Sequence, residues 1–143
     1  MENLALNKHA TASNITYPYT PSKAVDGVIS PFSRWQSNSV PCWLSIDIGS
    51  PFLVNRWVVR HLPLAGWPTF RYVNIEYQLQ GSLDNFSWFD LDFVKDNISS
   101  FTDRTFTPSK AQYFRVYITK GLKANPDVAS IVELEIYQSP EPL

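Results

Sequence analysis

Short segments in which apolar and polar residues alternate recur along this chain, and they constrain its fold more than any other feature. In residues 43–48 (WLSIDI) and 72–80 the alternation predicts strands with one buried face. Residues 54–62 are apolar almost throughout, which predicts a more central strand. Further extended segments are predicted at residues 4–11, 86–93, 104–106, 113–119 and 131–137. About eight strands with no helix between them predict an all-β sandwich or jelly roll.

Turn-forming residues separate the predicted strands. Residues 49–51 (GSP) and 82–85 (SLDN) predict turns, and Asn85 is a residue that tolerates the left-handed backbone conformation. Residues 13–20 and 63–70 contain prolines and predict surface loops. Four tryptophans fall in strands or regular motifs and are expected in the core: Trp35, Trp43, Trp57 and Trp88.

The composition excludes several classes of protein. With 143 residues the chain is long enough for one domain with a proper core and too short for two ordinary ones. Charged residues make up 17% and the net charge is −1, so no basic field is present to bind nucleic acid. A single cysteine, Cys42, excludes an intramolecular disulfide and a multi-cysteine metal site. No apolar run approaches the roughly 20 residues of a membrane-spanning helix.

The two ends of the sequence give an expectation about domain organisation. No signal peptide follows Met1, and residues 139–143 (SPEPL) resemble the start of a linker. The chain is therefore either a cytoplasmic protein or a module excised from a longer secreted chain. We expect the second arrangement, with residues 1–138 as one module and residues 139–143 as the start of a linker.

Residues 23–35 (KAVDGVISPFSRW) form the stretch that carries most functional information. Asp26 is followed at once by Gly27, which permits positive φ, and Pro31 prevents a helix from continuing, so the stretch predicts a tight irregular loop. A carboxylate ringed by backbone carbonyls in such a loop suits a hard cation such as Ca²⁺. The alternative is an ordinary Asp-Gly turn between strands. A second carboxylate from Glu133, near the other end of the chain, favours the cation.

Several motifs in a fixed order give the chain a resemblance to a known family. They are NLALN (residues 3–7), KAVDG, RW, WLSIDIG, SLDNFSW, YFRVYI and VELEIY. Together they resemble the discoidin, or coagulation factor 5/8 type C, domain, which is carbohydrate-binding module family 32 in microbial glycoside hydrolases. The resemblance implies a galactose-binding-domain-like β-sandwich. Animal members usually join their termini with a disulfide, which one cysteine cannot form, so the resemblance favours the microbial, sugar-binding branch.

The resemblance also implies a structural Ca²⁺ between the Asp-Gly loop and the last strand. Its ligands, carried over by motif, would be oxygens only, as Ca²⁺ requires. They are the carbonyls of Lys23, Val28 and Ala129, the carboxylates of Asp26 and Glu133, and an oxygen of Ser33. Because Pro31 and Phe32 look inserted, Ser30 could replace Ser33. The structural alternative is that Glu133 faces solvent beside Glu135 on an edge strand.

Aromatic side chains in the predicted loops indicate a sugar-binding face. Sugars stack their C–H groups on exposed rings, and their hydroxyls bond planar polar groups nearby. Trp67 is expected to be the main platform, and His61 either caps a loop or touches ligand. The full predicted set is Tyr17, Tyr19, Gln36, Arg60, His61, Trp67, Arg71 and Asn125, and Phe32 is a further ring in a loop.

The resemblance predicts a non-catalytic module that targets a parent glycoside hydrolase, joined in the same chain, to a polysaccharide. Galactose-binding relatives carry His and Trp where this chain has Gln36 and Ser39. We therefore expect a β-mannan or other hemicellulose ligand, bound by a secreted monomer. A galactose or N-acetylgalactosamine lectin is the first alternative, and a phospholipid-binding or protein-adhesion discoidin domain is the second. The acidic residues that could act in glycoside hydrolysis, Asp84, Asp90, Asp92 and Asp103, are expected to be solvated.

Overall fold

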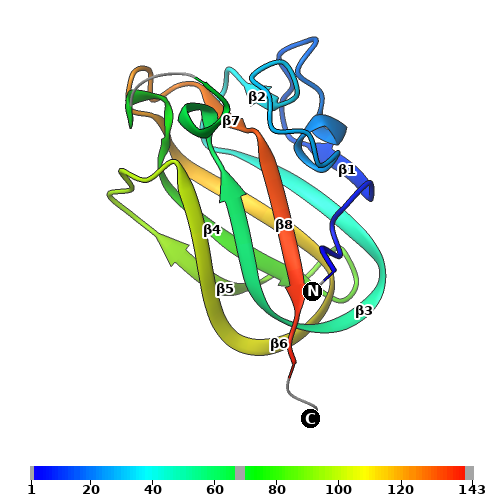
Figure 1. Ribbon diagram of the computed structural model, residues 1–143. Coiled ribbons are helices and arrows are strands. Elements are labelled where there is room, and N and C mark those ends of the chain that lie inside the picture. Colours follow the sequence, from blue (N-terminus) through cyan, green and yellow to red (C-terminus); the bar gives the residue numbers. More distant parts are fainter. Residues whose placement is uncertain (1, 67–69, 141–143) are drawn as a thin grey trace.

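The computed structural model describes residues 2–66 and 70–140 as a β-sandwich, which confirms the predicted fold class. Within the described residues there are eight strands and three short 3-10 helices, and Figure 1 shows their arrangement. The strands are β1 (His9–Ala12), β2 (Trp35–Ser37), β3 (Cys42–Arg60), β4 (Asn74–Ser82), β5 (Phe89–Val94), β6 (Phe101–Leu122), β7 (Ala129–Ile131) and β8 (Glu133–Gln138). The 3-10 helices are η1 (Pro21–Ala24), η2 (Leu62–Ala65) and η3 (Phe70–Tyr72).

Two long strands, β3 and β6, run through both layers of the sandwich. The first half of β3 pairs with β1 and with the second half of β6, in the layer ordered β1-β3-β6-β4-β5. After a register shift between Asp47 and Phe52, the second half of β3 pairs with β8 and with the first half of β6. The small β2-β7 ladder lies beside this framework.

The prediction of separate strands on either side of residues 49–51 is wrong. Gly49 has φ 95°, which only glycine adopts easily, and the backbone bends there without ending the strand. The predicted strands at residues 104–106 and 113–119 are likewise parts of the single strand β6. The turn at residues 82–85 is confirmed, and Asn85 has the expected left-handed backbone, with φ 63°.

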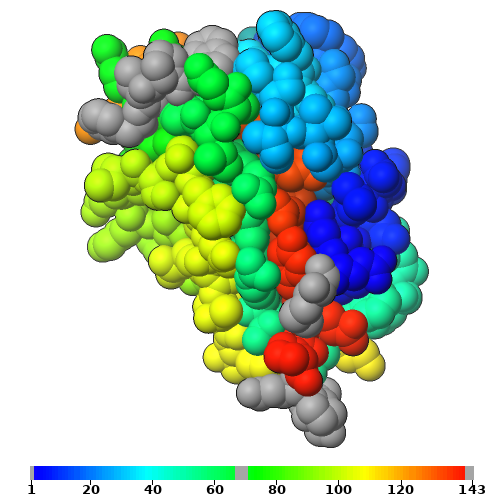
Figure 2. Space-filling view, viewed as in Figure 1, coloured from blue at the N-terminus to red at the C-terminus, as the bar shows by residue number. Residues whose placement is uncertain are grey.

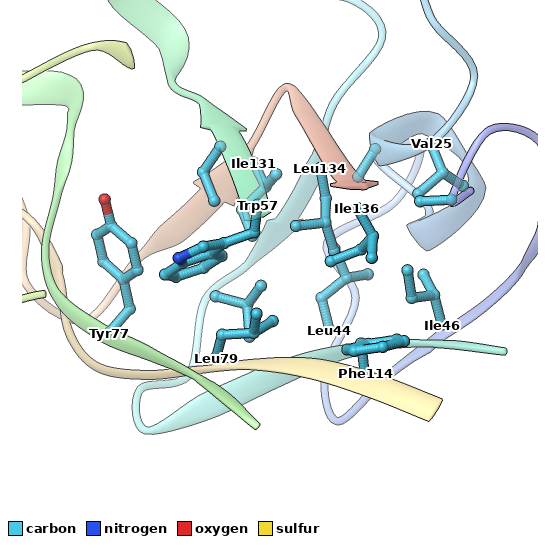
Figure 3. Packing of buried hydrophobic residues seen from close by; sticks show 14 of the residues in the cluster. Val25, Leu44, Ile46, Trp57, Tyr77, Leu79, Phe114, Ile131, Leu134 and Ile136 are labelled. Carbon is cyan, nitrogen blue, oxygen red and sulfur yellow. The ribbon is translucent and has the colours of Figure 1, made fainter. Parts of the chain in front are cut away.

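The core lies between the two layers and is closely packed (Figure 3). Leu44, Ile46 and Phe114 come from one layer, and Leu134 and Ile136 come from β8 in the other. All five are at most 1% exposed. Burial of such side chains supplies most of the driving force for folding, at about 25 cal/mol per Å² of apolar surface.

Tryptophans divide between the core and the surface. Trp35 and Trp57 are fully buried, as predicted, and Trp57 packs edge-on against Tyr77 with ring centroids 5.9 Å apart. Trp43 and Trp88 are only half-buried, so their predicted place in the core is wrong. Because Leu44 points inward and successive strand residues alternate, its neighbour Trp43 faces outward.

Asn3 and Ser139, near the two limits of the described residues, are bonded to the body of the sandwich. Asn3 bridges to Tyr137, and its side-chain oxygen accepts hydrogen bonds from the amides of Ala5 and Ile136, each at 3.0 Å. The amide of Ser139 donates to the Leu53 carbonyl at 2.8 Å, so the chain stays on the body slightly beyond the predicted boundary at residue 138. Among the described residues, no helix has the length and apolar character needed to cross a bilayer.

Candidate functional site

Connecting segments from three parts of the chain gather at one end of the sandwich, which we call the loop end. They are residues 13–34, residues 61–66 with 70–73, and residues 123–128, drawn blue to cyan, green and orange at the top of Figure 1. In the space-filling view, the segment before β2 and the residues after β3 both contribute to the surface of this end (Figure 2). The predicted metal ligands and most of the predicted sugar-binding residues belong to these segments or adjoin them.

The loop after η1 folds around the Asp26 carboxylate. Gly27 has φ 79°, and a side chain there would come within 3.1 Å of Leu6, so the position requires glycine. The Val28 amide donates to Asp26 Oδ1 at 2.9 Å, and the Ser33 hydroxyl donates to Asp26 Oδ2. Ser33 Oγ also lies 3.4 Å from the Lys23 carbonyl oxygen. The fold therefore brings together oxygens of three predicted metal ligands.

Glu133 completes this cluster from the first position of β8. Its Oε2 accepts a hydrogen bond from the Gly27 amide at 2.8 Å, and its carboxyl group contacts that of Asp26. The side chain is buried, at 2% exposure, which contradicts the alternative that it faces solvent. Burial, and then the nearby negative charge of Asp26, raises the pKa of Glu133 to about 8.

The Asp26–Glu133 cluster has the features of a cation site. Glu133 Oε1 is buried and has no hydrogen-bond partner among the described residues, which is costly for a carboxylate oxygen. Two adjacent carboxylates also need a shared proton or a positive charge between them. The part of the chain that the structure describes holds no group of three or more His, Cys, Asp or Glu side chains suited to a metal. Further ligands must then be carbonyl or hydroxyl oxygens, which fits Ca²⁺ better than Zn²⁺.

The remaining predicted metal ligands occupy different positions. Val28 follows Gly27 in the same loop, and Ala129 begins β7, which leads into β8 through Val132. Ser30, the alternative to Ser33, accepts a hydrogen bond from the Phe32 amide at 3.2 Å in its own small turn. The structure thus joins Ser33, and not Ser30, to the Asp26 carboxylate.

A compact polar and aromatic group lies in the segment that enters β2. The Arg34 guanidinium lies over the Tyr19 ring, 3.7 Å from its centroid, and Arg34 Nε donates to Gln36 Oε1 at 3.0 Å. The backbone N–H of Gln36 donates to the Tyr19 carbonyl at 3.2 Å, so a main-chain hydrogen bond holds the segments of Tyr19 and Gln36 together. Tyr17 stands next to it with 75% of its surface exposed. Sequence reasoning missed Arg34, although the RW motif contains it.

Two further predicted residues, Arg71 and Asn125, are exposed at the loop end. The Ala124 amide donates to the Arg71 carbonyl at 2.7 Å, so the segments that carry them lie side by side. A cavity of about 190 Å³ adjoins this segment and is lined by Ile75, Asp96, Asn97, Ile98 and Lys123. Trp67, the predicted main platform, lies outside the described residues.

Arg60 forms an ion pair with Glu135 on the sheet, whereas His61 lies in the interior. Arg60 Nε donates to Glu135 Oε2 at 2.6 Å and its guanidinium lies over the Phe101 ring, so the side chain is engaged on the outer face of the sheet. His61 is fully buried, 3.1 Å from the Tyr77 hydroxyl and 3.3 Å from that of Thr102. A ring with no exposed surface cannot touch a ligand, so the predicted contact of His61 with sugar is wrong.

Comparison with known proteins assigns the family. A model of the F5/8 type C domain matches residues 9–134. Chitosan-binding module 1 of a chitosanase/glucanase from Paenibacillus sp. IK-5 is 32% identical, with 96% of this chain and 99% of that chain covered and a TM-score of 0.78. Module 2 of the same enzyme, solved with chitotriose, is 30% identical, with 94% and 99% covered and a TM-score of 0.77.

A more distant structure shares the fold. The family 32 carbohydrate-binding module of Streptococcus pneumoniae EndoD is 22% identical, with 96% of this chain and 100% of that chain covered and a TM-score of 0.81. A search of curated proteins found no match. The family model covers most of the chain and a 32% identical module covers nearly all of it. The chain therefore belongs to the F5/8 type C domain family.

Proposed function

We propose that this chain is a non-catalytic carbohydrate-binding module that holds a polysaccharide chain at the loop end. Its role is to keep a parent glycoside hydrolase, joined to it in a longer secreted chain, close to an insoluble substrate. The observation that carries this proposal is the exposed Tyr17 beside the Tyr19–Arg34–Gln36 group. The similarity to two chitosan-binding modules supports it.

The chemistry of the loop end suits a sugar chain. The Tyr17 ring offers a flat apolar surface on which the C–H groups of a sugar can stack, and the half-buried Gln36 offers a planar carboxamide for its hydroxyls. Arg34 is itself buried and acts on the ligand only by holding Gln36 in place. The ion-dipole bond between Arg34 and Gln36 orders both side chains before a ligand arrives, which lowers the entropic cost of binding. The surface is open, so we expect modest affinity from a monomeric module.

The ligand we propose is a β-1,4-linked polysaccharide, with chitosan as the first candidate because of the two similar modules. β-Mannan or another hemicellulose, favoured by the departure of Gln36 and Ser39 from the galactose-binding pattern, is the second candidate. In both chains axial C–H groups form a flat apolar face that can lie on an aromatic ring.

We also propose a structural Ca²⁺ at the Asp26–Glu133 cluster. The fit rests on the unpartnered Glu133 Oε1 and on the oxygen-only set of neighbouring groups. Lys23, Val28 and Ala129 would contribute carbonyl oxygens, and Asp26, Ser33 and Glu133 would contribute side-chain oxygens. The ion would supply a positive charge that joins the loop of residues 23–33 to β8 and so steadies the adjoining Tyr19–Arg34–Gln36 group.

The acidic residues support a non-catalytic function. Asp92 forms an ion pair with Arg104 and accepts a hydrogen bond from the Trp57 indole, while Asp103 forms an ion pair with Arg56. Asp84 Oδ1 accepts backbone hydrogen bonds from its own turn. Side chains used in this way hold the fold together, and none of the three is offered as an acid or base to a ligand.

Calorimetric titration with chitotriose, mannotriose and galactose tests the proposal, together with the variant Tyr17→Ala. Loss of one stacked ring should weaken binding about tenfold, because an aromatic contact contributes about 1.4 kcal/mol. Phe86→Ala is the matched control, since Phe86 is 86% exposed in the turn between β4 and β5, away from the loop end. The melting temperature of both variants should match that of the original protein.

Three outcomes contradict the proposal in different ways. If Tyr17→Ala bound the sugars with unchanged affinity, the sugar-binding site would not be at the loop end. Binding of galactose alone would favour the lectin alternative. Sedimentation with anionic vesicles, and no heat with any sugar, would favour a phospholipid-binding domain.

A further inference from the structure

The outer face of the β1-β3-β6-β4-β5 layer carries side chains that the loop end does not use. Residues directly opposite each other on neighbouring strands project from the same face. Trp43 on β3 lies opposite Tyr117 on β6, Tyr117 lies opposite Gln78 on β4, and Gln78 lies opposite Phe93 on β5. Three rings and one carboxamide therefore form a row across four strands, over three strand spacings, or about 14 Å.

The next row along the strands is polar and centres on Arg115. Its guanidinium lies 4.3 Å from the centre of the Trp88 ring and 5.5 Å from that of Tyr117. Arg115 Nε donates to Gln80 Oε1 at 2.6 Å, and Gln80 Nε2 donates to Asp90 Oδ1 at 2.9 Å. Among the described residues the two Nη nitrogens have no hydrogen-bond partner. The two rows together place the rings of Trp88 and Tyr117 next to the planar guanidinium of Arg115, which Gln80 holds in position.

Two adjoining cavities lie on this outer face. One of about 240 Å³ is lined by Thr11, Trp43, Ser45, Asn85, Trp88 and Arg115. Another of about 200 Å³ shares Thr11, Ser45 and Asn85 and adds residues such as Asp47 and Tyr113. Because they share one wall, they form a single groove of the size usual for ligand sites, roughly 300–1,000 Å³.

We propose that this groove is a second saccharide-binding site, for a β-linked oligosaccharide segment that lies across the strands. The inference rests on the proposed function, because it assumes that the module binds a polysaccharide. Half-exposed rings can stack on sugar C–H faces, and Arg115, Asn85 and Asp47 can bond the hydroxyls. The charges of Arg115 and Asp47 offset each other, so the lining of the groove has no net positive charge that would favour an anionic chain.

Because the groove is separate from the loop end, a second site there would make the affinity depend on the length of the polysaccharide chain. It lies on the flank of the sandwich, on strands, whereas the loop end is built from connecting segments. Two separate sites on one module let a long polysaccharide bind twice, which raises its affinity over that of a short oligosaccharide. The loop end alone gives no such dependence on chain length.

The test titrates chitohexaose and mannohexaose into the intact protein and follows the indole N–H signals by NMR. The signals of Trp43 and Trp88 should shift in the original protein and in Tyr17→Ala, because the groove does not depend on the loop end. Trp88→Ala should weaken the remaining binding in Tyr17→Ala about tenfold. Asn85→Gly is the second variant, since it removes a carboxamide from both cavities and glycine accepts φ 63° without strain. Phe86→Ala, in the same turn and outside both cavities, is the control.

The outcomes separate the two proposals. Shifts of loop-end amides without any shift of the Trp43 and Trp88 signals overturn the groove and leave the proposed function standing. Shifts in the groove alone support this inference and remove the loop end as the site. No binding of either hexasaccharide overturns both.

Discussion

The loop end and the outer face of the β1-β3-β6-β4-β5 layer contain the same chemical unit built in two ways. At the loop end the Arg34 guanidinium covers Tyr19 at 3.7 Å and bonds Gln36 at 3.0 Å. On the sheet the Arg115 guanidinium covers Trp88 at 4.3 Å and bonds Gln80 at 2.6 Å. Each unit joins a ring, a cation and a carboxamide.

The difference lies in what holds each unit in place. Arg115 and Gln80 are direct partners in the β4-β6 ladder, so the strand register sets their geometry. The Tyr19–Arg34–Gln36 group adjoins an irregular loop that reaches the sheet through Gly27, Asp26 and Glu133. The geometry of the loop-end group therefore depends on the contacts of Gly27, Asp26 and Glu133 that join its loop to β8, which we call the staple. The geometry of the group on the sheet depends only on the pairing of β4 with β6.

The largest expected effect is loss of this staple. Removal of Ca²⁺ with EDTA, or the variant Asp26→Ala, should lower the free energy of unfolding by about 2.7 kcal/mol at Ca²⁺ 100-fold above its dissociation constant. For a domain of this size that corresponds to a fall in melting temperature of about 10 °C. Saccharide affinity at the loop end should fall as well, while the Trp43 and Trp88 signals should still respond to hexasaccharide.

Differential scanning calorimetry with and without Ca²⁺ measures the first part, and the NMR titration measures the second. Asp127→Ala is the matched control, because Asp127 is an exposed acid in the segment of residues 123–128. Equal melting temperatures with Ca²⁺ and with chelator would mean that the Asp26–Glu133 pair shares a proton instead of a metal. Parallel loss of binding at both sites would mean that the staple supports the whole fold.

A smaller effect is expected from pH, through His61 beneath the loop end. Burial lowers the pKa of His61 to about 3, against about 6.5 in an unfolded chain. Between these values the unfolded chain binds a proton that the folded protein does not, so stability is lost as pH falls through this window. At pH 5 the loss from this one residue is about 2 kcal/mol relative to pH 7.

Urea unfolding at pH 7 and pH 5, in saturating Ca²⁺, measures this contribution as the difference between the original protein and His61→Gln. The original protein should lose about 2 kcal/mol more than the variant, since glutamine keeps hydrogen-bonding capacity near Tyr77 and Thr102 but does not titrate. His9→Gln, which alters an exposed histidine, is the matched control. If the free energy of unfolding changed equally between pH 7 and pH 5 in all three proteins, His61 would have to be protonated in the folded protein at pH 5.

The sequence predicts what depends on local pattern. Alternation in residues 43–48 and 72–80 identifies two strands correctly. The motif resemblance places Asp26 and Glu133 together, although Glu133 bonds a residue, Gly27, that lies 106 positions earlier in the sequence. The continuity of β3 and β6 was not predictable in this way. Glycine and proline in residues 49–51 read as a turn, and only long-range pairing shows that the ladder resumes after a bend.

The errors at His61, Trp43 and Trp88 have a common cause. Trp43 and Leu44 are both apolar, and alternation alone does not say which of them faces the core; the packing of Leu44 in the core cluster between the two layers decides it. His61 is buried by side chains from distant strands, such as Tyr77 and Thr102, which no local signal announces. Tertiary contacts, rather than propensity, determine both outcomes.

The smallest expected effect separates the two serines of the loop proposed to bind Ca²⁺. Ser33→Ala removes the hydroxyl that meets Asp26 and the Lys23 carbonyl, and it should weaken Ca²⁺ binding about fivefold, or about 1 kcal/mol. Ser30→Ala is the matched variant, with the same atom removed three residues earlier, and it should leave Ca²⁺ affinity nearly unchanged, because Ser30 Oγ serves its own turn. Calorimetric titration of Ca²⁺ into the metal-free proteins measures both constants. A larger loss of Ca²⁺ affinity in Ser30→Ala than in Ser33→Ala would assign the hydroxyl ligand to Ser30 and contradict the choice of Ser33, because the two serines lie side by side in the same turn.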